Sequence, residues 1–196
     1  MSRACAWFGL LLAAVLISAS HADAAGVSWQ IEGGLGSSWV PEPTPPSQPA
    51  ASIYAAIGFP TRPVRITGEF GAAASFEPIG LSFIPESPVP GRRSLTTFLI
   101  GLEAGSARAR GPFAMVGVGG GHATLSGAKP GMEQFPTGPP IPDRSVTDLA
   151  FGAGLGWRST GGPGPLGFQF ALRYHAVAHD GAIAGSATAV TFGLAY

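Results

Sequence analysis

The chain ends on residues 186–196, Ser-Ala-Thr-Ala-Val-Thr-Phe-Gly-Leu-Ala-Tyr. In this stretch large apolar side chains alternate with small or polar ones: Val190, Phe192, Leu194 and Tyr196 against Thr191, Gly193 and Ala195. Strict alternation predicts a β-strand with one apolar face. A strand at the end of the chain has an edge that no later segment covers. We therefore expect it to pair with the first strand and close a β-barrel.

The composition agrees with such a barrel. Charged residues make up only 11% of the 196 residues, and the formal net charge is zero. A low charge content is unusual for a water-facing surface and suits a barrel whose outer face meets lipid. The 30 glycines and 19 prolines show no collagen period, which indicates strands and turns. Lys129 is the only lysine, so no basic surface predicts a nucleic-acid partner.

Residues 1–25 are predicted to be a signal peptide, followed by one barrel domain at residues 26–196. Arg3 supplies the positive start, residues 4–17 form the apolar core, and Ala22-Asp23-Ala24 is a small-residue cleavage site. Cleavage after Ala24 or Ala25 fits equally well. The alternative is an uncleaved signal anchor, although the apolar run is shorter than a full span of about 20 residues. The single cysteine, Cys5, lies in this leader, so the mature chain has no disulfide or cysteine metal site.

Alternation continues through seven earlier segments and predicts eight strands in all. They cover residues 26–40, 51–59, 64–76, 95–104, 113–124, 146–158, 166–175 and 186–196. The register of 64–76 is the best determined, because a shift of one residue would push Arg65 and Glu69 into lipid, at about 2–4 kcal/mol for the arginine.

Two strands depart from simple alternation. Leu99 falls on the polar parity of its strand. In 113–124 the apolar residues change parity between Met115 and Val116, so its orientation stays open. The glycine run 119–121 is either a bend or a bulge.

The predicted connections alternate in length. Residues 41–50, 77–93, 125–145 and 176–185 are long, whereas 60–63, 105–112 and 159–165 are short. Outer-membrane barrels have short periplasmic turns and longer external loops. An even number of strands puts both termini on one side, and the short turns make that side the periplasm.

The aromatic residues on the apolar parity lie mostly near predicted strand ends, where membrane-interface girdles occur: Trp29, Phe59, Phe76, Trp157, Phe168, Tyr174 and Tyr196. A soluble β-sandwich would also alternate, but its water-facing parity would carry charge. Here the second parity is mainly glycine and alanine. The sequence therefore favours an all-β, eight-stranded, antiparallel, up-and-down transmembrane barrel.

With these features the chain resembles the small eight-stranded outer-membrane β-barrel family, whose members are porin-like domains of Gram-negative bacteria. The resemblance rests on Gly-Val-Ser-Trp at residues 26–29, Phe-Gly-Ala-Gly-Leu-Gly-Trp-Arg at 151–158, Phe-Ala-Leu-Arg-Tyr at 170–174 and Val-Thr-Phe-Gly-Leu-Ala-Tyr at 190–196. It implies a cell outer-membrane location, and a final strand read by the barrel assembly machinery. That signal most often ends in Phe, where this chain has Tyr196.

The inward parity carries seven charged residues that we expect to form a polar network in the lumen: Glu32, Arg65, Glu69, Glu103, Asp148, Arg158 and Arg173. An eight-stranded barrel is narrow enough for side chains to fill it, and buried charges need partners. Counting from the turns predicts two pairs, Arg65 with Glu103 and Asp148 with Arg173. A gated conduction path is the alternative.

Three histidines and an aspartate raise the question of chemistry. We expect His175, His179 and Asp180 in the last outer loop, with His122 at the top of its strand. A metal site or an acid–base pair would use these residue types, but no spacing fixes ligand geometry, so exposed loop histidines are the simpler interpretation.

Two further patterns lack an essential part. Arg173-Tyr174-His175 resembles the strand of outer-membrane lipid A deacylases, yet the nucleophilic serine position holds Val177. The glycine-rich runs 117–121 and 152–156 lack the lysine and the helix of a phosphate-binding loop. The proline-rich segments 41–49 and 130–142 are either binding surfaces or stiff connectors.

The sequence predicts a non-enzymatic outer-membrane barrel that is structural, adhesive or ligand-contacting through its outer loops. Its expected partners are outer-membrane lipids and the assembly machinery, as a monomer without metal or cofactor. Two alternatives stay open: a membrane-embedded hydrolase of lipid A or phospholipid with His175 as base, and a secreted soluble barrel holding a small apolar ligand.

Overall fold

A computed structural model of the chain describes residues 27–41, 47–60, 64–76, 92–105, 111–126, 143–160 and 166–196. The predicted signal peptide and the proline-rich segment 130–142 lie outside these residues, so the proposed domain boundary stays a prediction. Within the described residues, no helix has the length and apolar character needed to cross a membrane.

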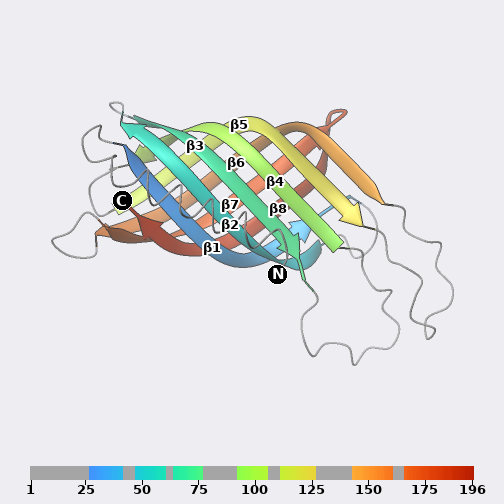
Figure 1. Ribbon diagram of the computed structural model, residues 1–196, viewed down its shortest axis with the longest axis horizontal. Coiled ribbons are helices and arrows are strands. Elements are labelled where there is room, and N and C mark those ends of the chain that lie inside the picture. The colour runs from blue at the N-terminus through green and yellow to red at the C-terminus, as the bar shows by residue number, and fades with distance from the viewer. Residues whose placement is uncertain are drawn as a thin grey trace, which may run out of the picture.

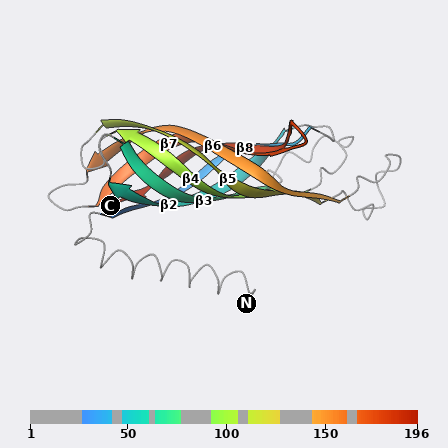
Figure 2. The ribbon, with the colours of Figure 1, turned by 90° about the horizontal axis from the view of Figure 1, so that it is seen from above.

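Eight antiparallel strands form one closed barrel in which each strand pairs with the next in the chain. The strands are β1 (Ser28–Trp39), β2 (Ser47–Pro60), β3 (Val64–Ser75), β4 (Arg92–Gly105), β5 (Gly111–Ser126), β6 (Arg144–Thr160), β7 (Gly167–His179) and β8 (Ala182–Ala195). β8 pairs back onto β1 from Gln30↔Ala195 to Trp39↔Ser186. The expected closure by the final strand is therefore confirmed, and the strands wrap obliquely around the long axis in Figure 1 and Figure 2.

The barrel is apolar outside, and most of its inward positions are polar or small. In β7, for example, Phe168, Phe170 and Leu172 are about half exposed, whereas Gln169 and Arg173 are buried. The large exposed hydrophobic side chains of the described residues share the outward parity along their strands. An outward apolar wall with inward polar groups is the pattern of a transmembrane barrel, as the alternation predicted.

The structure settles the orientation of β5. Phe113 and Met115 are buried inside, and Val116 and Val118 point outward. The glycine run 119–121 stays in continuous register with both neighbouring strands, so it is neither a bend nor a bulge. Leu99 is buried on the inward parity, where the sequence placed it.

The last connection differs from the prediction of a long loop. β7 runs to His179 and β8 starts at Ala182, which leaves only Asp180 and Gly181 between them. Both adopt positive φ, 50° and 78°, as a two-residue hairpin requires. Asp-Gly is a strong signal for such a turn, and here it overrides the long–short rhythm of the earlier connections.

The remaining connections follow the rhythm. The end of the barrel that carries Ser28 and Ala195 also carries the connections 61–63, 106–110 and 161–166; we call it the terminal end. The opposite end carries 40–46, 76–91, 127–143 and the Asp180–Gly181 hairpin; we call it the loop end. In Figure 1 the tip of the β5 arrow marks the loop end at right, and the end of β8 lies at left.

Candidate functional site

Six of the seven charged residues predicted for the lumen lie inside the barrel and are buried: Glu32, Arg65, Glu69, Glu103, Arg158 and Arg173. They come from five strands: β3 contributes both Arg65 and Glu69, and β1, β4, β6 and β7 contribute one residue each. Three arginines face three glutamates, so the formal charges cancel. Asp148 is the exception and is exposed at the loop end.

The first cluster lies toward the terminal end. Arg65 and Glu103 are register partners on β3 and β4, and Nη2 of Arg65 lies 2.6 Å from Oε2 of Glu103. This is the pair expected from the sequence. Arg158 Nη1 donates to the other oxygen of Glu103 at 3.1 Å, and its Nη2 donates to Gln30 Oε1 at 2.9 Å. The Arg158 guanidinium also covers the Phe113 ring, 4.7 Å from its centroid.

The second cluster is built around Arg173. Its Nε donates to Glu32 Oε2 at 3.0 Å and its Nη1 to Glu69 Oε2 at 3.0 Å, and its Nη2 also donates to Glu32. Thr191 and Gln169 donate further hydrogen bonds to the Glu32 carboxylate. Several donors on one carboxylate, and one arginine bridging two, are what burial of these charges requires.

The predicted pair of Asp148 with Arg173 is wrong. Arg173 is the register partner of Gly154, six residues along β6 from Asp148, which is about 20 Å of strand. Asp148 instead contacts His179: Oδ2 of Asp148 lies 2.8 Å from Nδ1 of His179, within hydrogen-bonding distance. The height estimate failed because it assumed that β7 ended at residue 175, whereas β7 continues four residues further.

His175 lies in the lumen and not in the last outer loop. It is buried on β7, with Nδ1 2.7 Å from Thr97 Oγ1 and Nε2 2.8 Å from Glu69 Oε1. Its ring packs 4.7 Å from that of Tyr54. The signal for this placement was the parity that His175 shares with Arg173. The Thr97 hydroxyl, the His175 imidazole and the Glu69 carboxylate follow one another as in a hydrolytic triad. All three side chains are buried inside the barrel, so the His175 imidazole does not face membrane lipid.

The other two histidines are exposed at the loop end. His122 Nδ1 lies 2.7 Å from Thr147 Oγ1, and His179 contacts both Asp148 and, at 3.4 Å, Asp180. Within the described ranges, no group of three His, Cys, Asp or Glu side chains is arranged to hold a metal ion.

Apolar side chains fill the lumen on the loop-end side of the charged clusters. This buried layer consists of Ala73, Leu95, Leu99, Ala123, Ala150, Val177 and Ala187, with Val146 packed against it. A second group, Phe113, Met115 and Ala171, packs beside the charged clusters. Charged pairs and these two groups together occupy the interior, as expected for eight strands.

Comparison with solved structures finds the same architecture at low sequence identity. Neisserial surface protein A matches with a TM-score of 0.60 and 10% identity, over 87% of this chain and 96% of that one. Ail, the attachment invasion locus protein of Yersinia pestis, matches with a TM-score of 0.49 and 19% identity, over 86% and 97% of the chains. The N-terminal β-barrel domain of Pseudomonas aeruginosa OprF matches with a TM-score of 0.42 and 13% identity, over 86% and 97%.

No protein-family model matches the chain, and no curated protein matches it in sequence. The structural likeness therefore carries the comparison, and at 10% identity it concerns the fold. With its closed ring of eight antiparallel strands, apolar outside and ion-paired within, the chain has the fold of the outer-membrane barrel of Neisserial surface protein A.

Proposed function

We propose that this protein is a non-enzymatic barrel of a Gram-negative outer membrane, and that it acts through its external loops as an adhesive or ligand-contacting surface. The observation that carries the proposal is the division of the barrel: the wall is suited to lipid, and the interior is filled by apolar side chains and by two clusters in which arginines pair with glutamates. The filled interior leaves no room for a reaction or a wide channel, and the wall faces lipid. The loop end is therefore the part of the barrel that we expect to contact a ligand or a host surface.

The lengths of the connections support this orientation. Residues 76–91 and 127–143 provide 16 and 17 residues at the loop end, whereas the terminal end has connections of three to six residues. External loops of outer-membrane barrels are the long ones, and exposed loops on a rigid scaffold commonly carry binding function. We place the terminal end in the periplasm, where the assembly machinery would meet β8, and expect a monomer.

Location is tested by tagging. A short epitope inserted into 127–142 should be detected by antibody on intact cells, whereas the same epitope in 106–110 should require permeabilised cells. The folded protein should also migrate faster on a gel before boiling than after. Detection of both tags only after permeabilisation, or partition of the protein into the aqueous phase without detergent, contradicts the proposal. The second result would favour the secreted soluble barrel.

The loop function is tested by replacing 77–91 and 127–142 with short turns. We expect the barrel to keep its heat-dependent gel shift and to lose adhesion of the expressing cells to a host-cell surface. Hydrolysis of lipid A or phospholipid by the purified protein, abolished by His175→Ala, would instead establish the hydrolase.

A further inference from the structure

The outward face of three neighbouring strands changes abruptly from apolar to polar near the loop end. On β4, β5 and β6 the outward positions at this end are Arg92, Ser94, Thr96, His122, Thr124, Ser126, Ser145 and Thr147, which we call the outer polar patch. The register places them in rows, with Thr96, His122 and Thr147 side by side in the lowest row. The patch thus contains six hydroxyl groups, one imidazole and one guanidinium on a single surface.

The patch is internally ordered. Ser94 and Thr124 share a hydrogen bond of 2.6 Å across β4 and β5, and His122 and Thr147 share one of 2.7 Å across β5 and β6. These bonds align the hydroxyls of adjacent strands in a layer that follows the barrel wall. Such a surface offers several donors and acceptors to a flat, polyhydroxylated molecule.

The next outward row toward the terminal end is apolar and consists of Phe98, Gly120 and Leu149. Phe98 is 64% and Leu149 54% exposed, which is the character of a lipid-facing wall. The step from His122 to Gly120 is two residues, or about 7 Å of strand. The polar patch therefore ends where the lipid-facing band begins, at the head-group level of the external leaflet.

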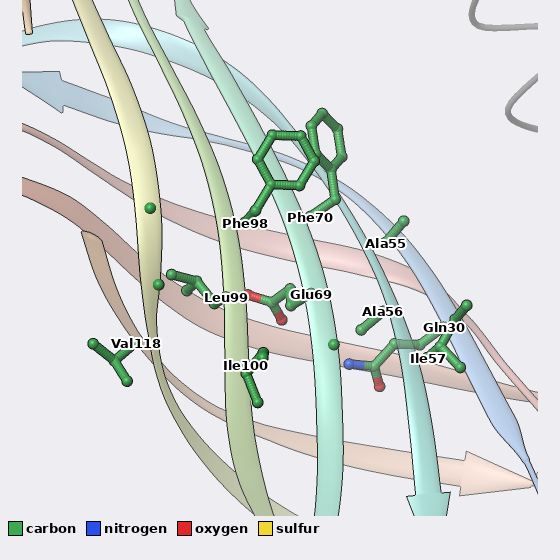
Figure 3. Close-up of a pocket in the computed structure, with 13 residues that line it drawn as sticks. Gln30, Ala55, Ala56, Ile57, Glu69, Phe70, Phe98, Leu99, Ile100 and Val118 are labelled. Carbon is green, nitrogen blue, oxygen red and sulfur yellow. The ribbon is translucent and has the colours of Figure 1, made fainter. Parts of the chain in front are cut away.

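A hollow of about 580 Å³ lies in the wall below the patch, and its lining includes residues of the inward parity, Gln30, Ala56, Glu69, Leu99 and Gly119. On its outward side it is framed by Ile57, Phe70, Phe98, Ile100 and Val118 around Gly68 and Gly120, as Figure 3 shows for the labelled side chains. The rings of Phe70 and Phe98 lie together at its upper edge, 5.0 Å apart. We call this feature the wall hollow.

The two glycines keep the wall hollow open. A Cβ added at Gly68 or Gly120 would meet no atom within 4 Å. Close packing therefore does not require glycine at either position, in contrast to Gly193, where a Cβ would collide with the backbone of Ile31. Glycine weakens a strand, and at these two positions the missing side chains leave the outward, apolar side of the hollow open.

We propose that the outer polar patch and the wall hollow together bind one glycolipid of the external leaflet that has a phosphorylated sugar head group. An acyl chain lies in the hollow beside Phe98, and the sugar hydroxyls meet the Ser and Thr rows. The guanidinium of Arg92 binds a phosphate, the anion that its planar fork suits best. This assignment rests on the proposed outer-membrane location. A phospholipid would use the hollow and the arginine but leave most hydroxyls of the patch without a partner.

The test compares two lipids on the detergent-solubilised, folded protein by native mass spectrometry and titration. The probes are lipid A, a bisphosphorylated and acylated glucosamine disaccharide, and phosphatidylglycerol. Gly120→Leu fills the hollow, and Arg92→Gln removes the charge. Gly33→Leu is the matched control for the first, because Gly33 also faces outward with its nearest atom 4.0 Å from an added Cβ, but lies on β1. Arg144→Gln, on the opposite parity of β6, is the control for the second.

We expect the wild-type protein to prefer lipid A, and each of the two site variants to weaken that binding by about tenfold. Both controls should stay within about twofold of wild type. Equal binding of phosphatidylglycerol, or equal binding by all variants, overturns the glycolipid site while leaving the outer-membrane location intact. A protein that fails to insert into bilayers at all overturns both.

Discussion

Trp29 and Tyr196 join the first and last strands at the terminal end of the barrel. The amide of each donates to the carbonyl of the other, at 3.1 Å and 2.8 Å, and their rings stack with centroids 6.0 Å apart and planes 6° from parallel. Both residues share the outward parity of their strands. The final residue of the chain thus closes the sheet by backbone bonds and by an aromatic contact on the outer wall.

Loss of this contact should impair closure. In Tyr196→Ala the stacking is lost while the backbone bonds remain, so we expect a smaller folded fraction after refolding into detergent. Tyr196→Phe keeps an aromatic ring and should refold like wild type. The measurement is the heat-dependent gel shift, and the prediction fails if the alanine and phenylalanine variants refold to the same extent.

Arg173 is the main counter-ion of the lumen. Arg173→Met leaves Glu32 and Glu69 without their arginine, and breaking a buried pair in this way typically costs about 3–5 kcal/mol. Urea unfolding from detergent micelles should show the change as a lower midpoint. The exposed Arg92→Met should change the free energy of unfolding by less than about 0.5 kcal/mol.

A double variant separates charge from packing. Arg173→Met combined with Glu32→Gln leaves one carboxylate fewer without compensation, so it should be more stable than Arg173→Met alone. If the double variant is the less stable of the two, packing around Arg173 and not charge balance explains its effect.

His175 is expected to stabilise the barrel and not to catalyse. His175→Ala removes a polar partner of Thr97 and one of the two partners of Glu69, which keeps Arg173. Leaving a buried polar group unsatisfied costs about 1–3 kcal/mol. Thr97→Val, which removes only one of the two bonds, should cost less. The midpoint of urea unfolding measures both, and an unchanged midpoint in His175→Ala would count against the structural role.

The rim of the loop end should respond to pH through His179. Its hydrogen bond to Asp148, with the nearby charge of Asp180, raises the pKa of His179 above its ordinary value of 6.5. The protonated histidine is favoured in the folded state, so this contribution to stability is complete below pH 6.5 and is lost as the pH rises through the raised pKa.

The two aspartates can be ranked by an NMR titration of the His179 ring. Asp148→Asn should lower the titration midpoint more than Asp180→Asn, because the bond to Asp148 is the larger cause of the shift and the shorter contact, at 2.8 Å against 3.4 Å. Equal midpoints in wild type and Asp148→Asn would contradict the assignment.

Local periodicity predicted most of the architecture. Each strand carries its own alternation, and burying one face fixes the parity of every residue on that strand. Eight strands, their order, the inward position of Leu99 and six of the seven lumen charges follow from that rule. The pair of Arg65 with Glu103 could also be predicted, since a short turn leaves little freedom in the register of β3 and β4.

The errors arose where a residue's height, and not its parity, mattered. Ending the seventh strand at residue 175 predicts Asp148 beside Arg173 and His175 in a loop, whereas the Asp180–Gly181 turn extends β7 to His179 and keeps His175 in the lumen. Strand five was ambiguous because glycines carry no parity signal of their own. The neighbours of Gly119 across β4 and β6, and not its side chain, decide which way that strand faces.

The sequence by itself determined that this protein is a closed β-barrel with an apolar exterior, because period-two alternation is a local property that each strand displays alone. Only the tertiary structure decided that Arg158 joins the pair of Arg65 and Glu103, that Arg173 bridges Glu32 and Glu69, and that a hollow lies below a row of hydroxyls. Those relationships depend on the stagger between strands that are distant in sequence, and no single strand contains that information.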